Sequence, residues 1–134
     1  TDAEGVPYGI GRVGQVKHPM PLSEFAAHVK ARLGAGGVRL VDCGKPVCRV
    51  AVGGGACGDL LPDAVSAGCD TFVTADVKYD GFLAAKALGL NLIDAGHYPT
   101  ENVVCPVLVE WLQAGFPEIP VLQSKCHNEV FSYL

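Results

Sequence analysis

The sequence lacks several features that would place it in a specialised class. It has no apolar run of about 20 residues that could span a membrane and no recognisable signal peptide. Its ten lysines and arginines are scattered singly rather than clustered, so neither a membrane nor a nucleic acid is expected as a partner. Charged residues make up only 18% of the chain and hydrophobic residues 49%, which excludes a disordered protein. The chain begins with Thr1 rather than methionine, so we expect that an upstream segment was removed or was never built.

The sequence also lacks the Cys-x-x-Cys spacing that is typical of structural zinc sites, although it contains six cysteines. Several of these lie in apolar runs, such as Cys48 within residues 47–52. Free cysteine is commonly buried as a small hydrophobic side chain. We therefore predict reduced thiols rather than a disulfide framework, which in turn favours a cytoplasmic location.

Apolar patterns with the periods of strands and helices alternate along the chain. Helices are expected to end at residues 33 and 67, the first with Ser23 as its cap, and to cover residues 78–88 and 100–113. The expected strands cover residues 8–16, 38–41, 47–52, 71–74, 91–94 and 119–122. This alternation predicts an α/β fold, a mainly parallel sheet with helices on both faces. The length of 134 residues fits a single domain, residues 1–134.

The end of the chain leaves two open points. Pro106 lacks a backbone donor and clashes with the carbonyl group four residues earlier. Either the regular helix begins near Asn102 or Val103, or the helix kinks at the proline. Residues 130–134 are apolar, so we expect this tail to pack against the domain.

One candidate metal site follows the strand at residues 91–94, where α/β sheets place their ligands. His97 and Glu101 are four residues apart across a turn, so their side chains can converge on one divalent ion. Asp94 is then the expected outer-shell partner for the second ring nitrogen of His97. A structural interpretation stays open, because a glutamate is also favoured at a helix start by the helix dipole.

The glycine-rich loop at residues 53–58 offers a second interpretation. Gly53, Gly55 and Gly58 have the G-x-G-x-x-G spacing of dinucleotide sites, and Asp76 follows near the position of a ribose-binding acid. The chain lacks a second mononucleotide half, however, and Pro62 lies in the next expected helix. A plain strand-to-helix turn is the alternative.

A third group of polar residues follows the strand at residues 71–74. Asp76, Lys78, Tyr79 and Asp80 are expected at the same edge of the sheet as His97. They can face a substrate. They can equally form a solvated turn with Asp76 as a helix cap.

Taken together, these segments resemble the Nif3 family of dinuclear-metal proteins, some of which are called GTP cyclohydrolase 1 type 2 homologues. The resemblance covers nearly the whole chain and is most specific at Asp76-Val-Lys-Tyr79 and at Leu92-Ile-Asp-Ala-Gly-His-Tyr-Pro-Thr-Glu101. It implies that His97 and Glu101 are metal ligands in the carboxy-terminal lobe of such a protein. The outer-shell or substrate-facing residues are then Asp94, Asp76, Lys78, Tyr79 and Asp80. The glycine loop becomes a structural turn.

Two departures from the family pattern bear on function. Asp80 stands where the family usually has a histidine. Nothing in the chain matches the family's first lobe, which supplies further histidines and an aspartate to the metals.

The resemblance implies a divalent metal (zinc, iron, manganese or magnesium), held incompletely by this chain alone. With the first lobe, it implies a metal-dependent hydrolase, GTP cyclohydrolase-like, acting on a nucleotide or related small molecule. It also implies a homohexamer. The alternative is a non-catalytic interaction or regulatory module that keeps the fold without a complete site.

Overall fold

The computed structural model describes residues 3–5 and 8–134, so the expectation that concerned Thr1 lies outside it. Five strands form one sheet in the order β1-β3-β4-β5-β2. The strands are β1 (Arg12–Met20), β2 (Arg39–Val41), β3 (Val47–Val52), β4 (Thr71–Thr74) and β5 (Asn91–Asp94). The three central strands β3, β4 and β5 are parallel, whereas β1 and β2 close the two edges in antiparallel pairing.

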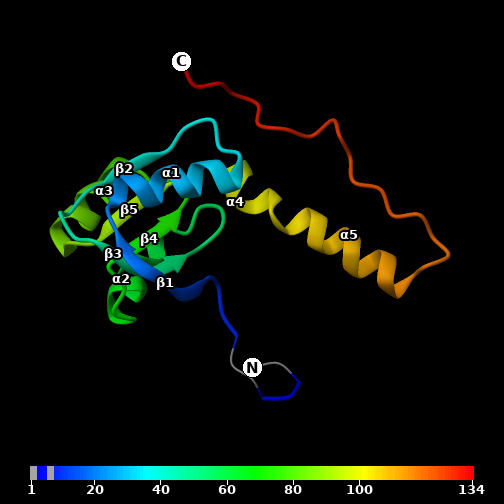
Figure 1. The fold of residues 1–134 in the computed structure, drawn as a ribbon, viewed down its shortest axis with the longest axis horizontal. Coiled ribbons are helices and arrows are strands. Elements are labelled where there is room, and N and C mark those ends of the chain that lie inside the picture. Colours follow the sequence, from blue (N-terminus) through cyan, green and yellow to red (C-terminus); the bar gives the residue numbers. More distant parts are fainter. Residues whose placement is uncertain (1–2, 6–7) are drawn as a thin grey trace.

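Helices cover both faces of the sheet, as the sequence predicted (Figure 1). Helix α1 (Leu22–Leu33) covers one face. Its core contains Leu22, Ala26, Val29, Val47, Val50, Val73, Ile93 and Ala95. The other face carries the 3-10 helix η1 (Gly58–Leu60), α2 (Leu61–Ser66) and α3 (Tyr79–Leu88). Its core contains Ala51, Leu61, Ala64, Cys69, Phe72, Val77, Ala85, Leu90 and Leu92. The predicted α/β class, with a mainly parallel sheet, is confirmed.

The apolar residues of helix α1 explain how it packs on its face of the sheet. Phe25, Val29 and Leu33 recur every four residues and pack on the sheet, and Gly34 ends the helix in the left-handed conformation at φ 63°. The expected cap is wrong. Ser23 lies inside the helix, and Pro21 precedes it without a side-chain hydrogen bond. The fixed φ of proline prepares the helix start in place of a polar cap.

The first strand begins later than predicted, at Arg12 instead of Tyr8. Gly11 adopts φ 78° and passes so close to the carbonyl group of Val52 that a Cβ there would lie 2.5 Å from its oxygen. The chain therefore bends at Gly11, and pairing begins with Arg12 opposite Val52. The strand can include Pro19 because β1 lies at an edge.

Two helices, α4 (His97–Asn102) and α5 (Val104–Gly115), replace the single helix expected over residues 100–113. The break at Val103 places Pro106 in the first turn of α5, where its missing N–H costs no helical hydrogen bond. This confirms the first of the two alternatives, in which the regular helix begins near Val103. Glu101 then lies in α4 together with His97.

The strand expected at residues 119–122 is wrong. Helix α5 leads the chain away from the sheet (Figure 1), and Pro120 has no N–H to offer a neighbouring strand. The side chain of Gln113 instead holds this segment, donating to the Ile119 carbonyl at 3.1 Å and accepting from the Val121 N–H at 3.1 Å.

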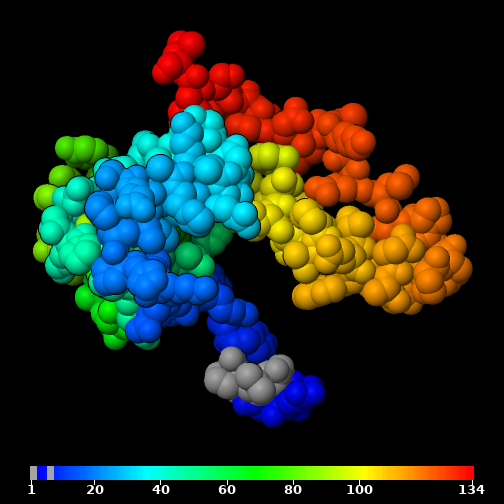
Figure 2. Space-filling view, viewed as in Figure 1, coloured from blue at the N-terminus to red at the C-terminus, as the bar shows by residue number. Residues whose placement is uncertain are grey.

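The carboxyl-terminal tail returns toward the body, as Figures 1 and 2 show. The Tyr133 ring lies against Gly36 and Gly37, which have no side chains to displace it. Val130 is nevertheless 92% exposed, so the expected packing is confirmed for the tyrosine and not for the whole apolar tail.

All six cysteines are free thiols in the described part of the chain, as the sequence predicted. No helix among the described residues is long and apolar enough to cross a membrane.

Candidate metal centre

The parallel pairing of β4 and β5 brings two candidate segments together. Thr74 and Asp94 are register partners at the carboxyl ends of these strands. The residues that follow each strand therefore emerge side by side, although about twenty positions separate them in the sequence. Asp76 comes from the β4 segment, and His97 comes from the β5 segment.

The short helix α4 brings the side chains of the two predicted ligands together. Gly96 turns the chain at φ 85°, and Thr100 Oγ1 donates to its carbonyl group at 2.8 Å. Nε2 of His97 lies 3.1 Å from Oε2 of Glu101, with side-chain exposures of 48% and 56%. The expected convergence on a solvent-accessible point is thus present. Coordination of a metal by these two residues stays a prediction.

The partner of the other histidine nitrogen is Asp76 and not Asp94. Nδ1 of His97 lies 2.6 Å from Oδ2 of Asp76. Among the described residues Asp76 is the only non-glycine residue with a positive φ, at 51°. Such a conformation is uncommon outside glycine and is often retained at functional sites. It directs the carboxylate toward the imidazole ring.

Asp94, expected to bind His97, is instead buried beneath the site with 4% exposure. Its Oδ2 accepts the Val77 N–H at 2.9 Å and pairs with Arg39, and its Oδ1 accepts the Gly96 N–H at 3.1 Å. The expectation for Asp94 is corrected by these contacts, which leave no oxygen directed at the imidazole. This carboxylate shapes the two turns that carry Asp76 and His97.

Lys78, Tyr79 and Asp80 do not join the cluster. All three are exposed at the start of α3, and Tyr79 is 78% exposed. None of them makes a hydrogen bond or ion pair with Asp76, His97 or Glu101 within residues 8–134. A role facing a substrate stays a prediction for them.

The cluster opens into a cavity of about 570 Å³. Asp76, His97 and Glu101 line one side, and residues 127–131 of the returning tail line another. The Tyr98 hydroxyl group donates to the His127 carbonyl at 2.9 Å and helps to hold that tail. Sequence reasoning missed this wall, because no local pattern links residues 127–131 to a turn thirty positions earlier.

Arg39, Thr74 and Thr100 were also missed. Arg39 reaches Asp94 from the edge strand β2, 55 residues away in sequence. The two threonines bind the glycine loop from different elements, at Gly55 O and at Gly55 N respectively. No local sequence pattern could have indicated these contacts, because each joins segments that are far apart in the sequence.

The electrostatic environment raises the pKa of His97 above 6.5. The hydrogen bond that the protonated ring donates to Asp76 is the largest cause, and the negative charge of Glu101 adds to it, whereas desolvation acts in the opposite direction. Since the folded-state pKa is raised, the protonated imidazole stabilises the fold fully below about pH 6.5, the unfolded value. That contribution is lost as the pH rises through the raised pKa.

We expect Asp76→Asn to bring the pKa of His97 back down toward 6.5, because the variant removes the strongest partner of the protonated ring. An NMR titration of the His97 ring protons in a chelator-treated sample measures this. Asp80→Asn is the matched control, since Asp80 does not contact His97, and it should leave the titration unchanged. An unaltered His97 pKa in Asp76→Asn would contradict the assignment.

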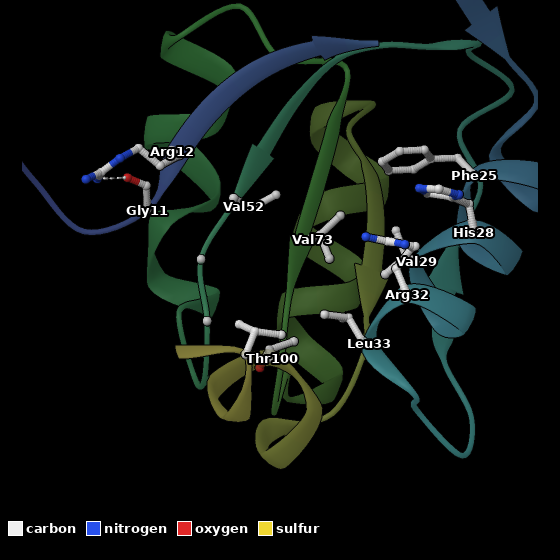
Figure 3. Close-up of a pocket in the computed structure, with 13 residues that line it drawn as sticks. Gly11, Arg12, Phe25, His28, Val29, Arg32, Leu33, Val52, Val73 and Thr100 are labelled. Carbon is white, nitrogen blue, oxygen red and sulfur yellow. Dashed lines mark hydrogen bonds between the residues drawn. The ribbon is translucent and has the colours of Figure 1, made fainter. Parts of the chain in front are cut away.

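On the far side of α4 lies a second cavity of about 610 Å³, between α1 and β3. Figure 3 shows Phe25, His28 and Arg32 extending from α1, with Val73 on the sheet and Thr100 at one end. His97 and Glu101 do not line it. The glycine loop passes between this cavity and the cluster.

We expect this loop to bind no NAD. Two N–H groups that could hold a pyrophosphate, those of Gly55 and Cys57, already bond to Thr100 Oγ1 at 3.0 Å and Thr74 Oγ1 at 3.2 Å. The Glu101 carboxylate lies next to Gly55 and would repel an anion. Isothermal titration calorimetry should detect no binding. Tight, stoichiometric binding that is lost in Gly55→Val would revive the dinucleotide interpretation.

Comparison with known proteins supports a common origin over almost the whole chain. A family model described as Duf34/NIF3 (NGG1p interacting factor 3) matches residues 3–129. The GTP cyclohydrolase 1 type 2 homolog of Staphylococcus aureus strain MRSA252 is 34% identical over 131 residues. That alignment covers 95% of this chain and 36% of the relative, so the chain spans about a third of the relative's length.

Solved structures agree with this relationship. A hypothetical protein of Staphylococcus aureus superposes with a TM-score of 0.87 at 36% identity, over 95% of this chain and 44% of that one. A Bacillus cereus protein related to NIF3 has a TM-score of 0.80 at 33% identity, over 94% of this chain and 36% of that one.

Proposed function

The chain belongs to the Duf34/NIF3 family, and we propose on that premise that it contributes part of a divalent-metal site through His97 and Glu101. The ion is zinc, iron, manganese or magnesium. The observation that carries the proposal is the approach of the two donors to 3.1 Å at an exposed edge of the sheet. Asp76 is the outer-shell residue that orients the imidazole ring.

The donor chemistry fits such an ion. Imidazole nitrogen and carboxylate oxygen bind divalent metals at about 2.0–2.2 Å. Two donors on one ion at these lengths lie roughly 3 Å apart, which matches the separation of Nε2 and Oε2. An acceptor on the opposite ring nitrogen fixes the tautomer of a ligand histidine, and Asp76 is placed to do this.

The donor set is incomplete within the described residues. No group of three or more histidine, cysteine, aspartate or glutamate side chains that could hold a metal occurs in residues 3–5 and 8–134. Catalytic zinc sites use three protein ligands. We propose that the remaining ligands come from a first lobe, in the same polypeptide or in a neighbouring one.

With those ligands, the site is proposed to serve a hydrolase acting on a nucleotide or related small molecule. A bound divalent ion supplies a water of lowered pKa and polarises the bond that is attacked. His97 and Glu101 are proposed to hold the ion, Asp76 to keep Nε2 of His97 directed at it, and the 570 Å³ cavity to admit the substrate. The raised pKa of His97 means that protons compete with the metal.

The test is metal binding by the natural full-length polypeptide. His97→Ala and Glu101→Ala should each lower zinc affinity by more than the roughly 10–100-fold that loss of an outer-shell partner costs. Asp76→Asn should fall within that range. Glu24→Ala, an exposed glutamate on α1, is the matched control and should bind like the wild type. Unchanged zinc affinity in both ligand variants would refute the proposal.

A second candidate function, protein interaction, is supported by α5. None of its residues is buried. One face carries an apolar stripe with exposures of 37–69%, made of Val104, Val107, Leu108, Trp111 and Leu112. An amphipathic helix with its apolar face uncovered normally lies against a partner. We propose that another subunit, as in a homohexamer, or the first lobe covers this stripe.

Light scattering coupled to size-exclusion chromatography distinguishes these partners. If α5 lies between subunits, Leu108→Glu lowers the molar mass of the assembly that the full-length polypeptide forms, while Leu83→Glu, at an exposed position of α3, does not. If α5 lies against the first lobe, the mass stays constant and Leu108→Glu lowers the unfolding temperature instead. If Leu108→Glu changes neither the molar mass nor the unfolding temperature, α5 is not an interface.

A further inference from the structure

The main chain of Gly55 connects the two segments that carry the carboxylates on either side of His97. We infer that Gly55 is a positioning residue of the metal site, which sets the place of Glu101 directly and of Asp76 through the backbone. This inference rests on the proposed function, since it assigns the residue that organises the proposed donors. It gives the conspicuous glycine loop a role other than nucleotide binding.

The N–H side of Gly55 faces α4. Its N–H group donates to Thr100 Oγ1 at 3.0 Å. The same hydroxyl group donates within the first turn of α4, to the Gly96 and His97 carbonyl oxygens at 2.8 and 3.0 Å. The loop is thereby attached to the residue next to Glu101 and to the turn that presents His97.

The carbonyl side of Gly55 faces the end of β4. Its oxygen accepts the Ala75 N–H at 3.0 Å, the Thr74 hydroxyl group at 3.1 Å and the Cys57 N–H at 2.9 Å. Ala75 immediately precedes Asp76, whose left-handed φ of 51° turns its carboxylate toward His97. One residue therefore bonds to the chain neighbours of both carboxylates, to Thr100 before Glu101 and to Ala75 before Asp76.

Glycine is favoured at this position for two separate reasons. Gly55 has φ 66°, in the region that other residues rarely adopt. A Cβ at Gly55 would also overlap Oε1 of Glu101. The overlap is with Oε1, at the end of the flexible Glu101 side chain, so we expect a methyl group to shift this carboxylate relative to Nε2 of His97.

The neighbouring glycines do not share this relation. A Cβ at Gly54 would approach the Thr100 carbonyl oxygen at 3.0 Å, and one at Gly53 would approach Cys57. A Cβ at Gly58 would meet nothing within 4 Å. Gly58 has no positive φ. Gly58→Ala is therefore a matched control within the same loop.

The experiment titrates the natural full-length polypeptide with Co²⁺ and follows its visible absorption. Gly55→Ala should lower Co²⁺ affinity about 10–100-fold, the range for residues that orient ligands, and should alter the absorption bands. Gly58→Ala should stay within about twofold of the wild type, the usual limit for independent sites. Equal affinity of Gly55→Ala and Gly58→Ala would overturn the inference.

A double-mutant cycle tests whether the effect passes through Glu101. In a Glu101→Ala background the overlapping carboxylate is gone, so Gly55→Ala should lower affinity less than it does in the wild type. The same loss in both backgrounds would show that the glycine acts on overall stability and would overturn the inference.

If circular dichroism shows that Gly55→Ala is unfolded, Thr100→Val takes its place, because it removes the acceptor of the Gly55 N–H with little change of shape. Thr100→Val should weaken Co²⁺ binding more in the wild type than in Glu101→Ala, and an equal loss in both would overturn the inference.

A crystal structure of Gly55→Ala separates this inference from the metal proposal. If the wild type binds no Co²⁺, the proposed function fails while the positioning role is still measured by geometry. Glu101 should then have moved away from Nε2 of His97 in Gly55→Ala, or in Thr100→Val if the former does not fold. A carboxylate that remains 3.1 Å from the imidazole, as in the wild type, would overturn the inference whether or not the ion binds.

Discussion

After dialysis against metal-free buffer, the 134-residue chain should retain far less than one equivalent of divalent metal. A polypeptide that also contains the proposed first lobe should retain about two equivalents, the number of ions in a two-metal site. The physical reason is the number of ligands. As the two proposed ligands, His97 and Glu101 would replace little of the ion's hydration shell, whereas three or more protein ligands make a lasting site. Affinity should therefore rise by orders of magnitude when the missing ligands are supplied.

Elemental analysis of the dialysed samples measures this difference. His97→Ala should remove the retained metal from the longer polypeptide, and Asp80→Asn, at an exposed carboxylate outside the cluster, should not. Two equivalents held by the 134-residue chain itself, and lost on His97→Ala, would show that the site is complete within these residues.

Asp94→Ala should lower the free energy of unfolding by about 2–3 kcal/mol, the cost of leaving buried hydrogen-bonding groups unsatisfied. The variant removes the acceptor of the Val77 and Gly96 N–H groups from a position that is 4% exposed. Arg39 adds little to the loss, because its side chain is 60% exposed and water can replace the carboxylate. Urea denaturation followed by circular dichroism gives the value.

Asp80→Ala is the control for this measurement. Asp80 lies exposed in the first turn of α3, where a carboxylate contributes at most about 1 kcal/mol through the helix dipole. If Asp94→Ala destabilises the protein no more than Asp80→Ala does, Asp94 does not anchor the two turns as described.

Much of the fold could be predicted because its signals are local. The strands β3, β4 and β5 have the bounds that their apolar, β-branched segments predicted. Local sequence patterns failed to predict strand bounds where contacts with distant parts of the chain decided them. Strand β1 shifted to Arg12 because of the close approach of Gly11 to Val52, and residues 119–122 form no strand because α5 carries them away from the sheet.

The candidate site divides in the same way. The four-residue spacing of His97 and Glu101 determined that their side chains could meet, since a single helical turn brings such positions together. The motif around them indicated the family. These conclusions needed no knowledge of any other part of the chain.

Only the tertiary structure decided which carboxylate serves the histidine. Asp94 is three residues from His97 and Asp76 is twenty-one, yet Asp76 binds the ring and Asp94 is buried against Arg39. The reason is the parallel register that pairs Thr74 with Asp94, together with the left-handed turn at Asp76. Contacts across neighbouring strands depend on register and not on distance along the sequence. The sequence by itself therefore indicated the two proposed donors, and the packing of β4 beside β5 determined how their side chains are held.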